Sequence, residues 1–417
     1  MNFPEPIALY ATTRTAIGKL AGFHAGVEPH RLLASSVAGT LIKANTHETL
    51  SLEEANNLSA EILNSIKPDF VDEAIIGNVR NSIGNIARVG VLEAGLPVET
   101  PAITVDRQCA SSMEAVALAA GKLLTGQANR VLVGGVESAS QAPWLYAKTA
   151  RPYGYFEPQP FRIRMGADRT GDPSMGETAE ILADEFSITR DQMDEFAALS
   201  HQRAELAIST AAFSADIWPY LGGLHKPFTA SQLNDECVRP GTTAAGLANL
   251  RPVFRPGTGR VTAANSSPLN DAAISALAVR ASDLPEEHRK QAIIVRGVVT
   301  VGLDPNRMGL GPALAIPKLL QAFDLSVADI DLFEINEAFA AQVLACLKHL
   351  QASGNEVPLE KLNLFGGAIA LGHPLGVSGL RIIQTLATAL RKNGKKRGIA
   401  SLCIGGGQGM ATLIEIL

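Results

Sequence analysis

The feature that most constrains the fold is a strand, a turn and a helix in direct succession between residues 102 and 124. Ala102–Val105 is a short apolar run, and residues 110–123 are mostly small or apolar, as in a packed helix. Arg130–Glu137 then forms a continuous apolar run, typical of a strand buried on both faces. Strands that alternate with helices predict a layered α/β domain.

The second half of the chain repeats this alternation of strands and helices. VLVGGVES (131–138) and SLCIGGGQG (401–409) are both apolar runs that end in glycines, and each follows a helical segment and a short polar turn. Two halves of like topology would bring their strand–helix turns to one shared pocket. Between them, residues 140–264 are richer in Pro and Gly, which predicts an insertion lying over the core.

The element assignments follow from hydrophobic period and breakers. The expected strands are 6–11, 73–77, 102–105, 130–137, 291–301, 331–335, 398–404 and 409–416. The expected helices are 30–44, 51–66, 86–96, 110–123, 176–186, 190–210, 271–280, 312–323, 338–350 and 378–391.

Composition excludes several function classes. The net charge is −5 and the pI is about 6.0, so no nucleic-acid surface is indicated, and the basic run 391–397 is interpreted as a solvated helix end. Four widely spaced cysteines show neither metal-ligand nor disulfide-scaffold spacing. With no signal-peptide pattern and no apolar stretch of membrane-spanning length, we expect a soluble cytoplasmic protein.

Cys109 is the first candidate for chemistry, because it stands where the turn becomes the helix. Backbone N–H groups and the helix dipole there favour the thiolate, so we expect a lowered pKa. A buried core cysteine is the alternative. Three later segments supply possible partners: Asn336 in NEAF, His373 in the glycine-rich segment 366–376, and Cys403 before a glycine run. Alone, His373 could be structural and Cys403 a core thiol.

Together these motifs resemble the thiolase family of the thiolase-like superfamily. The Cys109 turn, NEAF, GGAIALGHP and CIGGG occur in order, and the resemblance runs from Thr13 to Gly407. It implies a five-layered αβαβα fold of two similar halves with an inserted loop domain. The N-terminal half would comprise 1–139 and 265–289, the loop domain covering the coenzyme A (CoA) site 140–264, and the C-terminal half 290–417.

The resemblance also implies roles for five residues. Cys109 would be the nucleophile that takes the acyl group from acyl-CoA, and His373 the base that activates it. The His373 ring, with a water held by Asn336, would bind the thioester oxygen. Cys403 would move a proton at the α-carbon, and the backbone N–H groups of Cys109 and Gly405 would form a second oxyanion hole.

Substrate contacts are a further implication. Arg239 and Ser267 match family positions near the CoA phosphates and pantetheine, although a solvated Arg is the alternative. Met175, Met308 and Phe339 match apolar pocket positions that could equally be ordinary core. Glu337 is interpreted as a structural support rather than a catalytic carboxylate.

The resemblance implies a reversible reaction of acyl-CoA and CoA, namely thiolysis of 3-ketoacyl-CoA or the reverse condensation. CoA is a substrate, and no metal or other cofactor is expected. A homodimer or homotetramer is expected, with a β-oxidation enzyme as a possible partner and neither nucleic acid nor membrane as a ligand. Two alternatives lie outside thiolase chemistry: a condensing enzyme working with acyl carrier protein, and a non-catalytic acyl-CoA-binding subunit.

Four departures from the family pattern put chain length in question. Phe365 stands where Asn is common, Ser174 where the short-chain biosynthetic branch has His, and Pro268 where Gly is common. Ser112-Met113 replaces a frequent Gly-Leu. None removes a catalytic residue, so a short-chain acetoacetyl-CoA enzyme stays an alternative to a fatty-acid-degrading one.

Overall fold

The computed structural model describes residues 2–46, 71–148, 157–219 and 233–417. Its ten strands form one mixed sheet in the order β4-β3-β5-β6-β1-β7-β10-β9-β8, and β2 pairs with β6 at the side. The strands are β1 Asn2–Arg14, β2 Gly18–Lys19, β3 Glu73–Gly77, β4 Ala102–Val105, β5 Val131–Ser138, β6 Asn270–Arg280, β7 Ile293–Gly302, β8 Leu332–Ile335, β9 Arg397–Ile404 and β10 Gln408–Glu415.

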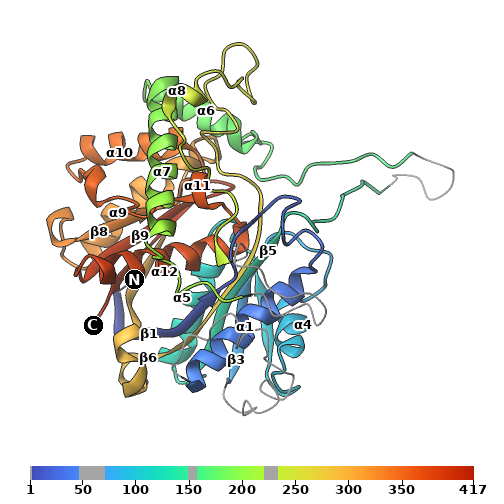
Figure 1. Ribbon diagram of the computed structural model, residues 1–417, viewed down its shortest axis with the longest axis vertical. Coiled ribbons are helices and arrows are strands. Elements are labelled where there is room, and N and C mark those ends of the chain that lie inside the picture. The colour runs from blue at the N-terminus through green and yellow to red at the C-terminus, as the bar shows by residue number, and fades with distance from the viewer. Residues whose placement is uncertain (1, 47–70, 149–156, 220–232) are drawn as a thin grey trace.

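Helices cover both faces of this sheet (Figure 1). The α-helices are α1 Pro29–Thr46, α4 Ile86–Glu93, α5 Ser111–Leu124, α6 Met175–Glu185, α7 Arg190–Ser209, α8 Ala244–Leu247, α9 Gly311–Ala322, α10 Ala340–Ala352, α11 Ala368–Leu371 and α12 Leu375–Lys392. The 3-10 helices are η3 Ala281–Asp283, η4 Glu286–Gln291, η5 Pro305–Leu310, η6 Val327–Asp329 and η7 Leu359–Lys361. Most predicted elements are confirmed to within a few residues, whereas the predicted helix 51–66 lies outside the described residues.

Alternating side chains along the strands separate the layers. In β5, Leu132 packs towards α1 and α4, whereas Val133 joins the central core around α5 and α12. In β9, Ala400 joins that central core, whereas Ile399 packs towards α9 and α10. The order is therefore α1 and α4, sheet, α5 and α12, sheet, α9 and α10, as Figure 1 shows. The five-layered αβαβα prediction is confirmed.

The two halves repeat one topology. β5 pairs parallel with β3 and antiparallel with β6, and β9 pairs parallel with β8 and antiparallel with β10. α5 precedes β5 in the chain, just as α12 precedes β9. Antiparallel pairing of β1 with β7 joins the halves into one sheet. The weak similarity between VLVGGVES and SLCIGGGQG therefore marks equivalent strands.

The predicted helix at 271–280 is wrong. These residues form β6, a strand flanked by β5 and β1, and every residue from Asn270 to Val279 is buried. Ala273 faces α1 and Ala276 faces the central helices, so small side chains let helices approach both faces. Ladder hydrogen bonds and burial on two sides outweigh the helix preference of alanine.

The insertion contributes α6 and α7, close to the predicted helices. Ser174 caps α6 by accepting a hydrogen bond from the backbone of Glu177, and Thr189 and Gln192 form a capping box at the start of α7. α6 packs against η5 and α10, and α7 packs against α10 and α11. The segments 139–148 and 157–173 extend outwards as an arm (Figure 1).

Candidate active site

Two helix N-termini meet at the centre of the molecule. The Ser112 hydroxyl in α5 donates to the Val377 carbonyl at 3.0 Å and accepts from the Leu380 N–H of α12 at 2.9 Å. Cys109 lies just before α5 and His373 just before α12, so the two turns lie at the same end of this helix pair. The hydroxyl therefore sets the register between the turns that carry the predicted nucleophile and base.

Glycine makes this close approach possible. A Cβ added at Gly376, in the first turn of α12, would lie 2.6 Å from the Val136 carbonyl oxygen and 2.8 Å from that of Gly77. At Gly379 it would lie 2.6 Å from the Met113 backbone nitrogen of α5. No larger residue fits without moving backbone, so Gly376 places α12 directly on β3 and β5, and Gly379 places it directly on α5.

Cys109 is half-buried beside the glycine loop that follows β9. Its thiol is hydrogen-bonded by the backbone N–H groups of Gly405 and of Cys109 itself. The expected lowering of its pKa is wrong, because burial raises the pKa of this thiol to about 11, with smaller contributions from Glu137 and Asp106. Cys109 is therefore a thiol at rest and needs a base.

His373 can serve as that base through one ring nitrogen. Its Nδ1 lies 2.7 Å from the Ser378 Oγ, and the Ser378 hydroxyl donates its proton to the Pro374 carbonyl at 2.8 Å. Ser378 therefore accepts from Nδ1–H, which leaves the lone pair on Nε2. Burial, aided by the charge of Arg381, lowers the His373 pKa to about 3, so the ring is neutral.

Sequence reasoning missed Ser378, and it also missed Asn270, whose Oδ1 accepts from the His373 backbone N–H at 2.8 Å. The available signals were a hydroxyl residue in the first turn after the histidine loop and the asparagine at the start of β6. Asn270 directly precedes the segment predicted as a helix, and the sequence reasoning gave it no role.

Asn336 and Cys403 come from the ends of neighbouring strands, β8 and β9, and both are buried. The Asn336 Nδ2 lies 3.5 Å from each ring nitrogen of His373. Burial and the nearby Cys109 raise the Cys403 pKa well above its usual range. Three of the predicted groups, Cys109, Cys403 and Gly405, therefore lie together, and Asn336 lies against His373.

Glu337 acts as a brace. Its carboxylate accepts from the Ser200 Oγ at 2.6 Å, the Asn363 Nδ2 at 2.8 Å and the Ile369 N–H at 3.3 Å. It thus ties α7 and β8 to the histidine loop, which supports the structural interpretation. Asn363, two residues before Phe365, also exchanges two hydrogen bonds with the Ile335 backbone at the end of β8.

Two family models cover the chain. Residues 54–282 match the thiolase N-terminal domain and residues 289–416 match the thiolase C-terminal domain. The chain belongs to the thiolase family. It is accordingly an acyltransferase.

Individual relatives agree with this assignment. The 3-ketoacyl-CoA thiolase of Salmonella choleraesuis (strain SC-B67) is 41% identical over 374 residues, which cover 87% of this chain and 93% of the relative. Human mitochondrial 3-ketoacyl-CoA thiolase, solved in complex with CoA, superposes with a TM-score of 0.84 at 32% identity, covering 100% and 99% of the two chains. Bacillus anthracis acetyl-CoA acetyltransferase superposes with a TM-score of 0.82 at 34% identity, covering 100% of both.

Of the predicted substrate contacts in this thiolase, Met175 is the best placed. A Cβ added at Gly405 would lie 3.7 Å from the Met175 Sδ and 2.4 Å from the Cε of Met165, a neighbour that sequence reasoning missed. The Phe339 ring packs edge-on against Phe254, with centroids 6.3 Å apart. Met308 is buried in the core around α9 and α10.

The two predicted CoA contacts lie on connecting segments. The Arg239 side chain is exposed, and its backbone N–H donates to the His201 Nδ1 at 3.2 Å. The Ser267 N–H donates to the Ala338 carbonyl at 2.9 Å, which places Ser267 next to the NEAF turn. Their contacts with CoA stay predictions.

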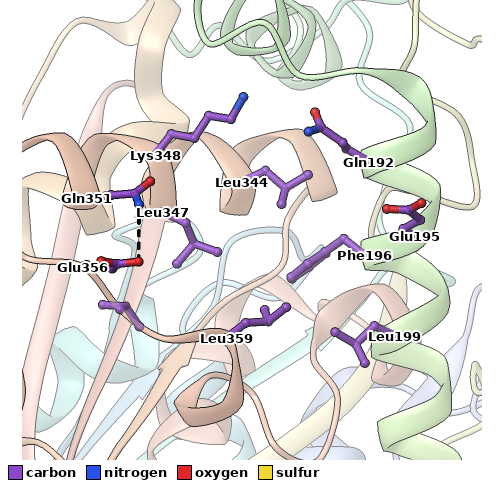
Figure 2. A pocket seen from close by; sticks show the side chains of 11 residues that line it. Gln192, Glu195, Phe196, Leu199, Leu344, Leu347, Lys348, Gln351, Glu356 and Leu359 are labelled. Atoms are coloured by element: carbon purple, nitrogen blue, oxygen red, sulfur yellow. Dashed lines mark hydrogen bonds between the residues drawn. The ribbon is translucent and has the colours of Figure 1, made fainter.

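Two hollows differ in their relation to the site. An open hollow of about 650 Å³ lies between 165–170 and 303–306 and reaches Gly406, next to Gly405. A second hollow, of about 290 Å³, lies between α7 and α10, and none of the predicted site residues lines it. Figure 2 shows its apolar side chains, such as Phe196 and Leu344, with charged side chains such as Glu195 and Lys348 among them. Among the described residues, no helix is long and apolar enough to cross a membrane, and no His, Cys, Asp and Glu side chains cluster as metal ligands.

Proposed function

We propose that this thiolase catalyses the reversible thiolysis of 3-ketoacyl-CoA by CoA through an acyl-Cys109 intermediate. The observation that carries the proposal is the Cys109 thiol, set beside the Gly405 N–H and the Cys403 thiol. The 3-ketoacyl-CoA thiolases of Salmonella choleraesuis and human mitochondria support the substrate class.

In the thiolysis direction, the His373 Nε2 takes the Cys109 proton and the sulfur attacks the 3-keto carbon. The backbone N–H groups of Cys109 and Gly405 stabilise the resulting oxyanion, whose collapse breaks the C2–C3 bond. The electron pair goes to the enolate of acetyl-CoA, whose oxygen faces His373 and an Asn336-held water. Cys403 donates a proton to C2, and acetyl-CoA leaves.

The second half regenerates the enzyme. The CoA thiol gives its proton to the Cys403 thiolate, and its sulfur attacks the acyl-Cys109 carbonyl. Collapse releases acyl-CoA, and the Cys109 thiolate recovers its proton from His373. This acyl transfer exchanges one thioester for another and is close to balanced. Each step can be reversed by the same groups, so the reverse cycle is a condensation. No resident cofactor takes part, and CoA is consumed as a substrate.

We further propose that the acyl chain exceeds acetyl length. An open hollow of about 650 Å³ lies beside the oxyanion loop, and Met165 and Leu303 give its mixed lining, which also includes Arg169 and Asp304, an apolar part for an alkyl chain. The similarity to an acetyl-CoA acetyltransferase from Bacillus anthracis keeps the short-chain enzyme as the second candidate. Arg239 and Ser267 would hold CoA, and Met175 and Phe339 would line the apolar path.

The deciding experiment compares thiolysis of acetoacetyl-CoA with thiolysis of a medium-chain 3-ketoacyl-CoA, each with CoA, for the intact protein and a Cys109→Ala variant. Activity that rises with chain length and vanishes in the variant supports the proposal. Activity on acetoacetyl-CoA alone would favour the short-chain enzyme. If the intact protein consumes neither substrate, the proposed thiolase reaction is contradicted and a binding subunit is favoured.

The carrier-protein alternative is tested separately with a Cys403→Ala variant. We expect this variant to accept an acyl group on Cys109 yet to fail in carbon–carbon bond formation. Full condensation by the variant would favour the synthase-like mechanism. Formation of the acyl-Cys109 adduct is followed by mass spectrometry, because the high pKa of Cys109 makes alkylation at neutral pH a weak test.

We also propose a homodimer. Among the described residues, β4 pairs only with β3, and no described strand covers its outer edge, while Ile103 on β4 is 46% exposed. The bacterial relatives and the absence of a membrane-spanning helix among the described residues support a cytoplasmic enzyme. A tetramer, or an assembly with a β-oxidation enzyme, would appear as a larger mass in light scattering.

A further inference from the structure

A buried polar cluster lies behind Asn336. Glu334 precedes Asn336 by two residues at the end of β8, so the two side chains share one face. Arg381 and Gln384, one turn apart in α12, complete the cluster. Glu334, Arg381 and Gln384 are each at most 3% exposed. None of the three belongs to the catalytic set predicted from the sequence.

Arg381 determines which way the Asn336 amide points. Its Nη2 donates to the Asn336 Oδ1 at 3.1 Å. A guanidinium group has no acceptor, so the amide atom that faces it must be the oxygen. The Asn336 Nδ2 is therefore turned towards His373, where it lies 3.5 Å from both ring nitrogens.

The amide N–H groups on that side are not bound tightly. A donor equidistant from both nitrogens of an imidazole cannot lie along the in-plane lone pair of Nε2, and 3.5 Å is long for a hydrogen bond. The Asn336 N–H is thus left for a third group at the face of His373. In the proposed cycle, that group is the water that contacts the enolate oxygen.

The cluster costs folding free energy, because its buried polar atoms are poorly paired. The Arg381 Nη1 lies 3.6 Å from the Glu334 Oε1, a loose pairing. The Arg381 Nε and Nη1, the Glu334 Oε1 and both Gln384 amide atoms have no hydrogen-bond partner among the described residues. Buried ion pairs of this kind contribute little net stability compared with apolar packing. A stability role therefore does not account for a guanidinium group here.

We propose that Arg381 is a positioning residue, which holds the Asn336 amide with its N–H groups towards His373, and that Glu334 compensates the buried charge. This inference rests on the proposed function, because it assigns Asn336 to the enolate oxygen. The two ideas are separable, since Asn336 can be tested without touching Arg381.

The test compares four variants: Asn336→Ala, Arg381→Lys, the charge-neutral double variant Glu334→Gln/Arg381→Met, and Gln384→Leu. The double variant removes both charges together, which guards against misfolding from a lone buried carboxylate. Gln384→Leu is the matched control, because it alters the same cluster without touching Asn336. Thiolysis kcat and KM are measured, together with exchange of the acetyl-CoA methyl protons in D₂O.

We expect the double variant to lower kcat by about 10- to 100-fold, somewhat less than loss of an oxyanion donor, with KM changed less than about threefold. Proton exchange should fall by the same factor as kcat, whereas acylation of Cys109 by acyl-CoA should persist. Arg381→Lys should recover part of the loss, and Gln384→Leu should change little. Adding Asn336→Ala to the double variant should lower kcat no further than Asn336→Ala alone.

Each contrary result has a distinct meaning. A folded double variant with unchanged kcat and exchange, alongside an impaired Asn336→Ala variant, overturns this inference and leaves the proposed function intact. Losses that multiply between the double variant and Asn336→Ala also overturn it. No effect of Asn336→Ala would instead refute the role assigned to Asn336, and no thiolysis by the unaltered enzyme would refute the proposed function.

Discussion

The ends of β3 and β8 are equivalent in the repeated topology, and an asparagine follows each strand. Asn78, after β3, is buried and donates from its Nδ2 to the Val136 carbonyl at 2.8 Å, so its amide N–H is used in a hydrogen bond to the main chain. Asn336, after β8, faces Arg381 with its oxygen and presents its N–H groups towards His373. One residue type in one position is structural in the first half and available for chemistry in the second.

The next pair of strands shows the same division. At the end of β5, Glu137 accepts from the backbone N–H groups of Arg80 at 2.9 Å and Gly376 at 2.8 Å. At the end of β9, Cys403 lies beside Cys109. In the proposed mechanism, the first half thus supplies the nucleophile, one oxyanion N–H and a frame, whereas the second half supplies the groups that move protons and the other oxyanion donors.

The largest predicted effect separates the two asparagines. Asn336→Ala removes a donor from the proposed enolate site, so we expect kcat for thiolysis to fall by about 10²- to 10³-fold. The unfolding free energy should also fall by about 1–3 kcal/mol, because the buried Arg381 Nη2 loses its acceptor. Asn78→Ala removes a buried backbone contact, and it should reduce the unfolding free energy by about 1–2 kcal/mol while kcat changes little. Steady-state kinetics and urea unfolding of both variants measure this, and equal kinetic losses would erase the distinction.

The next prediction concerns the nucleophile. With a pKa of about 11 for Cys109, only a small fraction of the enzyme carries the thiolate at pH 7.5. We expect iodoacetamide to modify Cys109 on the order of a hundredfold more slowly than a free cysteine, at a rate that climbs about tenfold per pH unit through pH 9. Mass spectrometry of the alkylated peptide gives the rate. A plateau near pH 7 would restore the low-pKa thiolate expected from the sequence.

Ser378→Ala tests whether the turn before α12 holds its histidine in the tautomer needed for a base. Without the hydroxyl, His373 loses the acceptor that keeps its proton on Nδ1, and the wrong tautomer becomes accessible. We expect kcat to fall about tenfold, within the range usual for general-base catalysis. Ser378→Thr, which keeps the hydroxyl, should recover most of the rate. Similar losses in both variants would indicate a packing effect instead.

The smallest effect concerns Glu137, whose pKa burial raises to about 7. Because this folded-state pKa exceeds the unfolded one, the folded protein binds the extra proton, and its contribution to stability is lost as pH rises from about 4.5 through 7. Glu137→Gln should abolish that dependence, a difference on the order of 2 kcal/mol between pH 5 and 8. Urea unfolding of both proteins at the two pH values measures it, and parallel pH profiles would show that another group titrates.

Much of the fold was accessible from the sequence, because β5 is a short continuous apolar run and α7 begins at a recognisable cap. β6 was not predictable, because its alanines have a local preference for helix. They are selected here because small side chains let helices pack closely on both faces of the strand. Its counterpart β10, in the repeated topology, was the signal that would have corrected it.

The site was predictable in its chemical groups but not in their electrostatics. Cys109, His373 and Cys403 stand in recognisable motifs, and the structure brings Cys109 and Cys403 together. The direction of the Cys109 pKa shift was wrong, because a helix N-terminus is visible in sequence whereas desolvation by distant segments is not. Ser378 and Arg381 were missed for the same reason, because their roles depend on contacts with His373 and Asn336 that only the folded structure shows.

Gly376 shows where this enzyme is vulnerable to change. A methyl group there would press on the Gly77 and Val136 carbonyl oxygens, so α12 would have to retreat from the first half and take the histidine turn with it. Random mutagenesis should therefore recover inactive yet folded proteins altered at this glycine, with every reactive side chain present. Substitutions that widen the spacing between the two halves should therefore abolish activity as surely as substitutions of the reacting groups.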